Sequence, residues 1–305
     1  MVRIILTWGL KMPMNKPLLL MPLLTAFCAV AADHVVILGF DGLSPDGVQN
    51  SKTPVMHEMM RQGAYTLHAR GVIPTVSSPN WASMIMGAGP AEHGVTSNEW
   101  QPDKFEIAPL CTGDGGFFPT IFGVTRAQKP AATIGVFHDW DGFGRLLEGK
   151  SVDVLKHGEG PDATMDMAIA FVKERKPAFT FVHCDHVDHA GHQFGHGTPE
   201  YYDSVAKADA LVGRMLAALK EAGIADRTIV LITADHGGVG KKHGGMTMAE
   251  LEIPWIVTGP GVAAGRELKT AVRTYDTALT VAYLLGVKPP ECWIGRPVME
   301  AFATK

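Results

Sequence analysis

Five short apolar runs recur along the chain, and amphipathic segments separate several of them. The runs cover residues 34–40, 132–137, 178–183, 228–233 and 254–258. Nearly continuous apolar runs of this length are typical of strands that are buried on both faces of a parallel sheet. The first run ends at Asp41-Gly42, which is a turn signal.

Three segments between or after these runs have apolar residues three and four positions apart, as an amphipathic helix does. They cover residues 164–173, 202–222 and 275–285. Strands that alternate with helices favour a doubly wound, mainly parallel sheet with helices on both faces. We therefore predict an α/β fold, with residues 33–305 as a single catalytic domain, although 305 residues would also suit two small domains.

The first 32 residues have the features of a secretory signal peptide. Three basic residues precede an apolar stretch over 17–32, which ends in small residues. A membrane anchor is less favoured, because the apolar stretch is short and interrupted by prolines. We predict cleavage after Ala31 or Ala32, export to the periplasm or medium, and no membrane span in the mature chain. Met14 is an alternative start.

Removal of residues 1–32 leaves an acidic chain with 24 basic and 31 acidic residues. This balance argues against nucleic acid or an anionic membrane as the main partner, and it favours a small-molecule substrate.

Three cysteines remain after cleavage: Cys111, Cys184 and Cys292. In an exported protein they allow one disulfide and one free thiol. Cys184 lies among histidines, but the favoured interpretation is a small buried residue on a strand.

Seven of the thirteen histidines lie between residues 183 and 243, interleaved with aspartates and glycine-rich turns. Imidazole and carboxylate groups are ligands of Zn²⁺ and related ions. Several of these residues, and also Asp41, come directly after an apolar run. Because ligands bind at the carboxyl ends of parallel strands, we expect these side chains to converge at one edge of the sheet.

Six residues form the predicted ligand set. Asp188 and His192 are four positions apart, so one helical turn presents both to the same ion. The others are Asp41, Asp235, His236 and His243. Six ligands exceed the need of one catalytic ion, and two ions roughly 3.5–4 Å apart suit displacement at phosphorus. The His-Glu-x-x-His signature of peptide hydrolysis is missing from the sequence.

The segment from Pro74 to Trp81 supplies a candidate nucleophile. We predict that Ser78 caps a helix in which Pro79 takes the first position. A hydroxyl at a helix N-terminus lies where backbone N–H groups favour a phosphate. Ser77 is therefore the predicted nucleophile.

These residues make the chain resemble the alkaline phosphatase superfamily, and most closely its nucleotide pyrophosphatase/phosphodiesterase branch, over about residues 33–260. The motifs that carry the resemblance are Phe-Asp-Gly at 40–42, Pro-Thr-x-Ser-x-Pro-Asn at 74–80, Asp-x-x-x-His at 188–192, Asp-His-Gly at 235–237 and His-Gly at 243–244. In addition, Glu-His-Gly at 92–94 is close to the Glu-x-His-Gly stretch of the family, which leads to an asparagine, here Asn98. The branch usually has threonine where this chain has Ser77.

The resemblance implies two Zn²⁺ ions, although Mn²⁺ or Fe also suits such ligands. One ion would bind Asp188, His192 and His243, and the other, beside Ser77, would bind Asp41, Asp235 and His236. Ser77 would form a covalent phosphoserine, and Asn98 would donate to a phosphate oxygen. His183, His186, His189 and His196 match no ligand position of the family.

The sequence favours phosphodiesters as substrates over phosphomonoesters, because residues 137–143 are apolar and acidic rather than basic. Trp81 and Trp140 are candidates for stacking on a leaving group. Sulfate esters are less favoured, because Trp81 occupies the last position of the Cys/Ser-x-Pro-x-Arg pattern. A phosphomonoesterase and a catalytically degenerate metal-binding module remain the alternatives.

Overall fold

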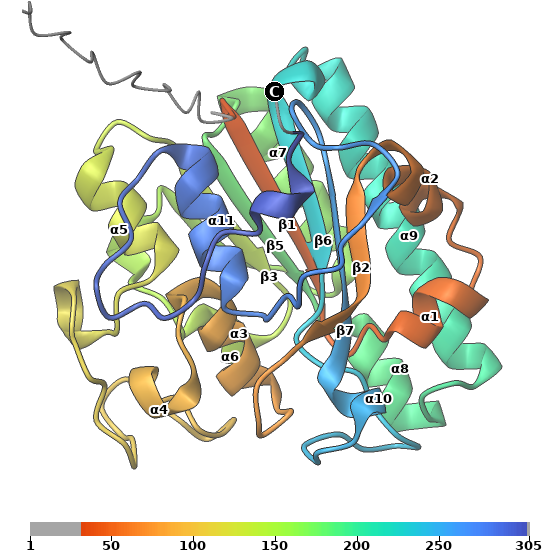
Figure 1. Ribbon diagram of the computed structural model, residues 1–305, viewed down its shortest axis with the longest axis horizontal. Coiled ribbons are helices and arrows are strands. Elements are labelled where there is room, and N and C mark those ends of the chain that lie inside the picture. The colour runs from red at the N-terminus through yellow and green to blue at the C-terminus, as the bar shows by residue number, and fades with distance from the viewer. Residues whose placement is uncertain (1–31, 304–305) are drawn as a thin grey trace, which may run out of the picture.

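Eight strands form one sheet in the order β4-β3-β5-β1-β6-β7-β2-β8 (Figure 1). This computed structural model describes residues 32–303. The predicted signal peptide, residues 1–32, therefore lies outside the described residues except for Ala32. The strands are β1 (His34–Phe40), β2 (Ala64–Arg70), β3 (Ile134–His138), β4 (Val154–His157), β5 (Phe179–Cys184), β6 (Thr228–Thr233), β7 (Glu252–Thr258) and β8 (Arg266–Glu267).

The central part of the sheet is parallel, as predicted. β4, β3, β5, β1 and β6 all run in the same direction. Every residue of β1, β3, β5 and β6 is buried, which explains why these strands are nearly continuous apolar runs.

The expectation of a parallel strand at residues 254–258 is wrong, because β7 runs antiparallel to both β6 and β2. The segment that joins β6 to β7 contains glycine-rich turns and only a four-residue helix, α10 (Met248–Leu251). Without a long crossover helix the chain returns directly beside β6. β2, β4 and β8 escaped prediction, because their exposed or polar residues interrupt the apolar pattern.

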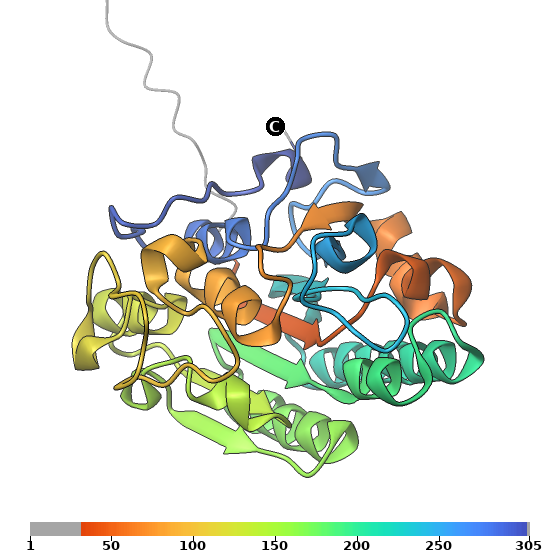
Figure 2. The same cartoon turned by 90° about the horizontal axis from the view of Figure 1, so that it is seen from below.

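Helices cover both faces of the sheet (Figure 2). One layer contains α2 (Pro54–Gln62), α7 (Pro161–Arg175) and α9 (Pro199–Glu221), and the other contains α3 (Ser77–Met86), α5 (Ile121–Gln128) and α11 (Asp276–Leu285). The helices predicted at 164–173, 202–222 and 275–285 are thus confirmed as α7, α9 and α11.

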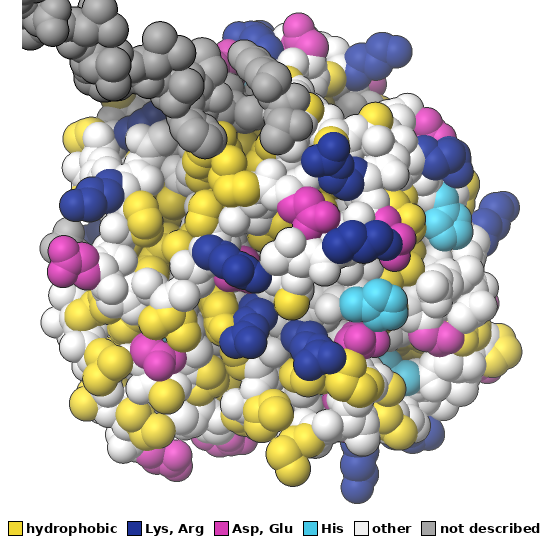
Figure 3. All heavy atoms as spheres, viewed as in Figure 1, with side chains coloured by type: hydrophobic (Ala, Val, Ile, Leu, Met, Phe, Trp, Pro, Cys, Tyr) yellow, Lys and Arg dark blue, Asp and Glu magenta, His cyan; other side chains and the backbone are white. Residues whose placement is uncertain are grey.

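The remaining helices are short. They are α1 (Pro45–Asn50), α4 (Pro90–His93), α6 (Asp141–Gly144) and α8 (His186–Phe194), with single turns η1 (Asp114–Gly116), η2 (Gly149–Ser151), η3 (Ala225–Arg227) and η4 (Met299–Ala301). Within residues 32–303, none of the helices is both long enough and apolar enough to cross a bilayer. On the face seen in Figure 3, acidic and basic side chains are interspersed with apolar ones.

The three cysteines of the described chain form one disulfide and one thiol. Cys111 pairs with Cys292 across 181 residues of sequence. Cys184 is unpaired and fully buried at the end of β5. This agrees with the predicted strand position of Cys184, and it settles which two cysteines are joined.

Removal of the disulfide should lower stability without loss of the fold. A bridge over a long loop restricts the unfolded chain, and its loss costs roughly 2–4 kcal/mol. We expect dithiothreitol to lower the melting temperature of the wild type. The double variant Cys111→Ser/Cys292→Ser should melt at the same temperature with and without the reductant. A reductant-sensitive double variant would contradict this pairing.

Candidate active site

The carboxyl ends of three adjacent strands bring the predicted ligands together. In the sheet register Phe40 of β1 lies beside Cys184 of β5, and Gly39 lies beside Thr233 of β6. The residues that follow these strands therefore emerge at one edge, which lies at the bottom of the sheet in Figure 1. This edge is where the sequence predicts the site.

The first ligand group contains Asp41, Asp235 and His236, and all three are buried. His236 Nε2 lies 3.3 Å from Asp41 Oδ1 and 3.2 Å from Asp235 Oδ2. One ligand atom of each residue lies within 4.8 Å of those of the other two. The structure therefore brings these three side chains together, and their role as ligands of one ion stays a prediction.

The second predicted ligand group is Asp188, His192 and His243, whereas the three-ligand cluster of the described residues joins Asp188 and His243 to His236. Asp188 and His192 lie one turn apart on α8, and Asp188 Oδ2 is 3.1 Å from His192 Nε2. His243 Nε2 is 3.1 Å from His192 Nε2 and 3.9 Å from Asp188 Oδ1. The two groups adjoin, since the rings of His236 and His243 stack with centroids 3.8 Å apart.

Backbone carbonyls orient all three imidazoles in the same way. The Nδ1–H groups of His192, His236 and His243 donate to the carbonyls of Lys241, Gly237 and Thr75 at 2.8–3.0 Å. Each ring therefore turns its Nε2 lone pair into the site. This arrangement is common for metal-ligating histidines.

One carboxylate oxygen of each aspartate also faces the site without a hydrogen-bond donor. Among the described residues, Asp41 Oδ1, Asp188 Oδ1 and Asp235 Oδ2 are buried and accept no hydrogen bond. The opposite oxygens are occupied: Asp41 Oδ2 accepts from Trp81 Nε1 at 2.9 Å, and Asp235 Oδ1 accepts from the Gly42 amide at 3.1 Å. Convergent lone pairs of this kind suit divalent cations.

The electrostatics of the cluster point to the same conclusion. Burial, together with the charges of Asp41 and Asp188, raises the pKa of Asp235 well above its usual value. Burial also lowers the pKa of His236, so this ring is neutral at pH 7. Asp41 differs: burial opposes its charged form, but His183 and His236 lower its pKa to about 2. The cluster gathers three carboxyl groups, and the groups beside them that can balance their charge include the titratable imidazoles of His183 and His192.

Ser77 lies against the first ligand group. It is buried, it is the first residue of α3, and its Oγ is 3.2 Å from His236 Nε2. The expectation that Ser78 caps this helix is wrong, because α3 begins two residues earlier than Pro79 and Val76 takes the cap position. The Ser78 N–H donates instead to Asn98 Oδ1 at 2.8 Å, which satisfies a free donor at the helix start.

Asn98 and Arg145 complete the surroundings of the serine. Because Asn98 accepts from Ser78 with Oδ1, the Nδ2 donors of its amide are left for another partner. The Arg145 guanidinium donates to Ser78 Oγ at 3.2 Å and also to the Asn98 carbonyl. Arg145 was missed from the sequence, since it lies two residues beyond the apolar and acidic segment 137–143.

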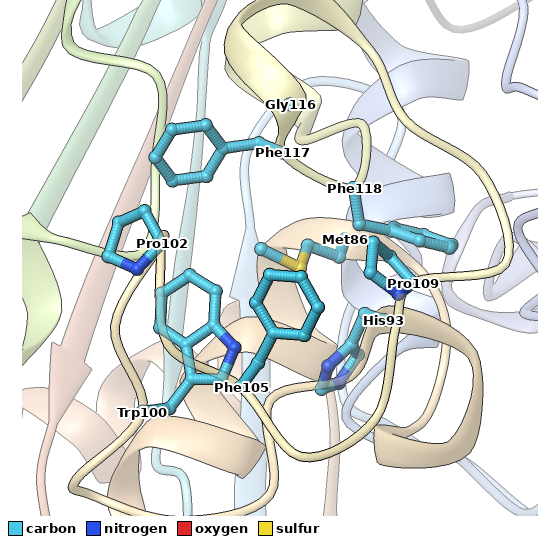
Figure 4. A pocket seen from close by; sticks show the side chains of 9 residues that line it. All are labelled: Met86, His93, Trp100, Pro102, Phe105, Pro109, Gly116, Phe117 and Phe118. Carbon is cyan, nitrogen blue, oxygen red and sulfur yellow. The ribbon is translucent and has the colours of Figure 1, made fainter.

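The segment that carries Asn98 is anchored by aromatic side chains. Figure 4 shows Trp100, Phe105, Phe117 and Phe118 gathered around Met86 and His93. The hollow between them has a volume of only about 10 Å³, which is about the space of one water molecule. This cluster is therefore a small core that fixes the segment, and it offers no room for a substrate.

The two tryptophans differ in their surroundings. Trp81 is fully buried and packs edge-on against Phe143, Phe181 and His183. Its predicted role of stacking on a leaving group is therefore wrong, and it positions Asp41 instead. Trp140 is partly exposed and lies beneath the Arg145 guanidinium, 5.9 Å from ring centroid to Cζ. Its proposed contact with substrate stays a prediction.

Several residues that support the ligands were not identified from the sequence. His183 Nε2 lies 3.2 Å from Asp41 Oδ2, and its Nδ1 lies 3.5 Å from Asp139 Oδ1. Although burial opposes it, contact with both carboxylates raises the pKa of His183 to about 9. Asp185 lies close to Asp41 and Asp188. The strand-end position of these residues was their only sequence signal.

A groove of about 520 Å³ opens beside the second ligand group. His196 lines it, and the Nε2 of His196 is 4.0 Å from Asp188 Oδ1. Met248 and Val239 give the groove an apolar part, and Asp46 and Glu252 give it an acidic part.

Residues 35–250 match the sequence profile of the family described as type I phosphodiesterase/nucleotide pyrophosphatase. Human ectonucleotide pyrophosphatase/phosphodiesterase family member 1 is 25% identical over 194 residues, which cover 60% of this chain and 21% of that protein. The chain thus spans about a fifth of the length of this relative and of its mouse and rat counterparts.

Solved structures share the fold at lower identity. Murine ectonucleotide pyrophosphatase/phosphodiesterase 5, solved as an inactive variant with AMP, aligns with a TM-score of 0.75 and 16% identity, covering 89% of this chain and 100% of that one. Wild-type alkaline phosphatase PafA aligns with a TM-score of 0.74 and 13% identity, covering 90% and 99%.

Proposed function

Because the chain belongs to the type I phosphodiesterase/nucleotide pyrophosphatase family, we propose that it is an exported, metal-dependent phosphoesterase acting on small phosphodiesters or pyrophosphates. The observation that carries the proposal is the convergence of three unpaired carboxylate oxygens and three imidazole Nε2 atoms beside Ser77. These groups meet the ligand demand of two divalent cations.

The two ligand groups divide the ions between them. Asp41, Asp235 and His236 would hold one ion beside Ser77, and Asp188, His192 and His243 would hold the other. Bound Zn²⁺, or Mn²⁺ or Fe at the same ligands, would stabilise charge on the attacking and leaving oxygens of a phosphoryl transfer. The preference for Zn²⁺ rests on the ligand types.

Ser77 is the proposed nucleophile. Its Oγ lies 3.2 Å from His236 Nε2, so an ion held by that nitrogen would lie beside the attacking oxygen and would favour loss of its proton. Attack of Ser77 Oγ on a phosphodiester would expel one alcohol, or a phosphate from a pyrophosphate, with the serine proton passing to the departing oxygen. The rest of the substrate would stay on Ser77 as a serine-linked phosphate ester, which for a phosphomonoester substrate is phosphoserine. Water would then cleave the serine–phosphate bond, release the remaining phosphate or phosphate ester and regenerate Ser77. The Ser77 N–H at the start of α3 and the Nδ2 donors of Asn98 would bind the non-bridging oxygens.

Export is supported by the signal-like residues 1–32 and by the Cys111–Cys292 disulfide, since disulfides persist in oxidising compartments. The name of the human relative describes that protein as an ectoenzyme.

Loss of the Ser77 hydroxyl should abolish turnover and leave the metal bound. We expect release of p-nitrophenol from bis-p-nitrophenyl phosphate to exceed that from p-nitrophenyl phosphate and from the sulfate, and a chelator to abolish all release. Ser77→Ala should lower the rate by more than about 1000-fold. Ser78→Ala, the matched control, should stay within about tenfold of the wild type, since it loses one ordinary hydrogen bond.

Metal analysis of both variants completes this test. Ser77→Ala should retain the same number of ions per chain as the wild type. A metal-loaded wild type that is inert towards all three esters would instead indicate a catalytically degenerate metal-binding module.

Metal affinity should rise with pH. The hydrogen bond to Asp188, against a smaller effect of burial, raises the pKa of His192 to about 9 in the metal-free protein. Below that pH a cation must displace a proton from His192, so affinity should strengthen by up to about tenfold per pH unit between pH 6 and 9. Titration against a competing chelator measures this. The slope should fall by about one proton in His192→Asn, and an unchanged slope would contradict the assignment.

A second candidate function is hydrolysis of phosphomonoesters, and Arg145 is the observation that favours it. Its guanidinium contacts Ser78 and Asn98, so it provides a fixed positive charge next to the serine. A monoester carries a second negative charge that a diester lacks. A guanidinium at this position would stabilise that charge.

Arg145→Ala should therefore affect the two ester classes unequally. Turnover of p-nitrophenyl phosphate should fall about 10- to 100-fold, as for loss of a charge-assisted hydrogen bond, while turnover of the diester falls less. Arg145→Lys should recover part of the monoester rate. Equal losses for both substrates would mean that Arg145 acts only by positioning Asn98.

A further inference from the structure

The last residues of β3 and β4 place two further imidazoles side by side. His138 and His157 are register partners of the parallel pair β3–β4, and their ring centroids are 5.2 Å apart. Asp141, the first residue of α6, brings its Oδ1 to 2.6 Å from His157 Nδ1. One ligand atom of each of the three residues lies within 4.8 Å of those of the other two.

The His138 ring is held in the same way as the three imidazoles of the candidate active site. Its Nδ1–H donates to the Trp140 backbone carbonyl at 3.0 Å, which leaves the Nε2 lone pair for another partner. A Cβ at position 144 would lie 2.6 Å from His138 Nε2. Gly144 therefore leaves space at this nitrogen that any other residue would fill.

We propose that His138, Asp141 and His157 form a third divalent-cation site, separate from the two-ion centre. Two imidazoles and one carboxylate are a ligand set for Zn²⁺ and neighbouring transition metals. His138 is buried, whereas the side chains of Asp141 and His157 retain 89% and 42% of their exposure. Water can thus complete the coordination sphere, and the ion should exchange more readily than ions held by buried ligands.

The strand register separates this site from the candidate active site. His138 lies beside His183 of β5, and β5 lies beside β1, which ends at Asp41. Since neighbouring strands are 4.7–4.9 Å apart, roughly 10 Å of sheet lies between His138 and Asp41.

Occupation of the third site would fix the position of α6 relative to β4. Phe143 of α6 stacks on Phe181 and His183, and Arg145 follows directly after this helix. The cation would therefore stabilise the segment that carries Arg145, which is a structural role distinct from the proposed chemistry.

Ion counting on single variants tests the proposal. The protein, purified without a histidine tag, is saturated with Zn²⁺ and passed through a gel-filtration column. The column buffer contains about micromolar Zn²⁺, so excess metal is removed and only ions bound at that concentration stay on the protein. Native mass spectrometry then counts the ions per chain. We expect His157→Ala and Asp141→Asn each to bind one ion fewer than the wild type. Both positions are exposed, so these variants should fold, and circular dichroism checks that they do.

The matched control is His68→Ala. His68 is also an exposed histidine, 3.2 Å from the carboxylate of Glu252, and it is absent from the three-ligand groups of the described chain. This variant should bind as many ions as the wild type. In addition, Zn²⁺ should raise the melting temperature of the wild type more than that of His157→Ala.

The proposal is overturned if His157→Ala and Asp141→Asn both retain the wild-type ion count, or if His68→Ala loses an ion as they do. The readout is a difference of one ion between variants and not a total. The test of the third site is therefore independent of the two-ion centre. If the two-ion centre bound no metal, the ion count would be lower by the same number in the wild type and in every variant.

Discussion

The concentration of buried carboxylates at one sheet edge is the constraint on which the rest of the site depends. Asp41, Asp188 and Asp235 each turn an oxygen without a donor toward the same space. Two like charges 4 Å apart repel by about 4 kcal/mol at the effective dielectric of a protein, so the cluster is unfavourable unless cations join it. Each aspartate is nevertheless held in place: Trp81 and His183 bind Asp41, the Gly42 amide binds Asp235, and α8 fixes Asp188 beside His192. The protein thus holds together a group of carboxylates that the proposed cations would stabilise further.

The fold achieves this geometry through strand ends and backbone carbonyls. Register places the ends of β1, β5 and β6 side by side, so residues almost 200 positions apart in sequence meet without long loops. Carbonyl groups then fix the tautomers of His192, His236 and His243. Ser77 is the first residue of α3, on the opposite face of the sheet, and its N–H group at the helix start is available to an anion. Of the proposed ligands, Asp188 and His192 therefore lie on a helix and His243 lies in the segment between β6 and β7, while the proposed nucleophile begins α3.

The burial of the central strands, and the position of the ligands after them, explains what could be predicted from the sequence. The runs that became β1, β5 and β6 are buried on both faces, so their apolar character alone identified them, and the residues after them were expected to converge. The antiparallel direction of β7 was not predictable from an apolar run, because the direction depends on the connection that precedes it. Arg145 and the burial of Trp81 also depend on tertiary contacts: Trp81 packs over Gly39, where even a Cβ would lie 2.6 Å from the indole ring.

The residues that could be predicted and those that could not differ in their proposed roles. The ligands that would support chemistry lie on strand ends and α8, where sequence periodicity reports their position. Asn98 and Arg145, which would sense the charge of the substrate, lie on connecting segments held by long-range contacts. The aromatic cluster around Trp100 and the Cys111–Cys292 bridge anchor one segment, and Phe143 anchors the other. Because such segments vary without disturbing the sheet, the choice between monoester and diester can change while the metal centre does not.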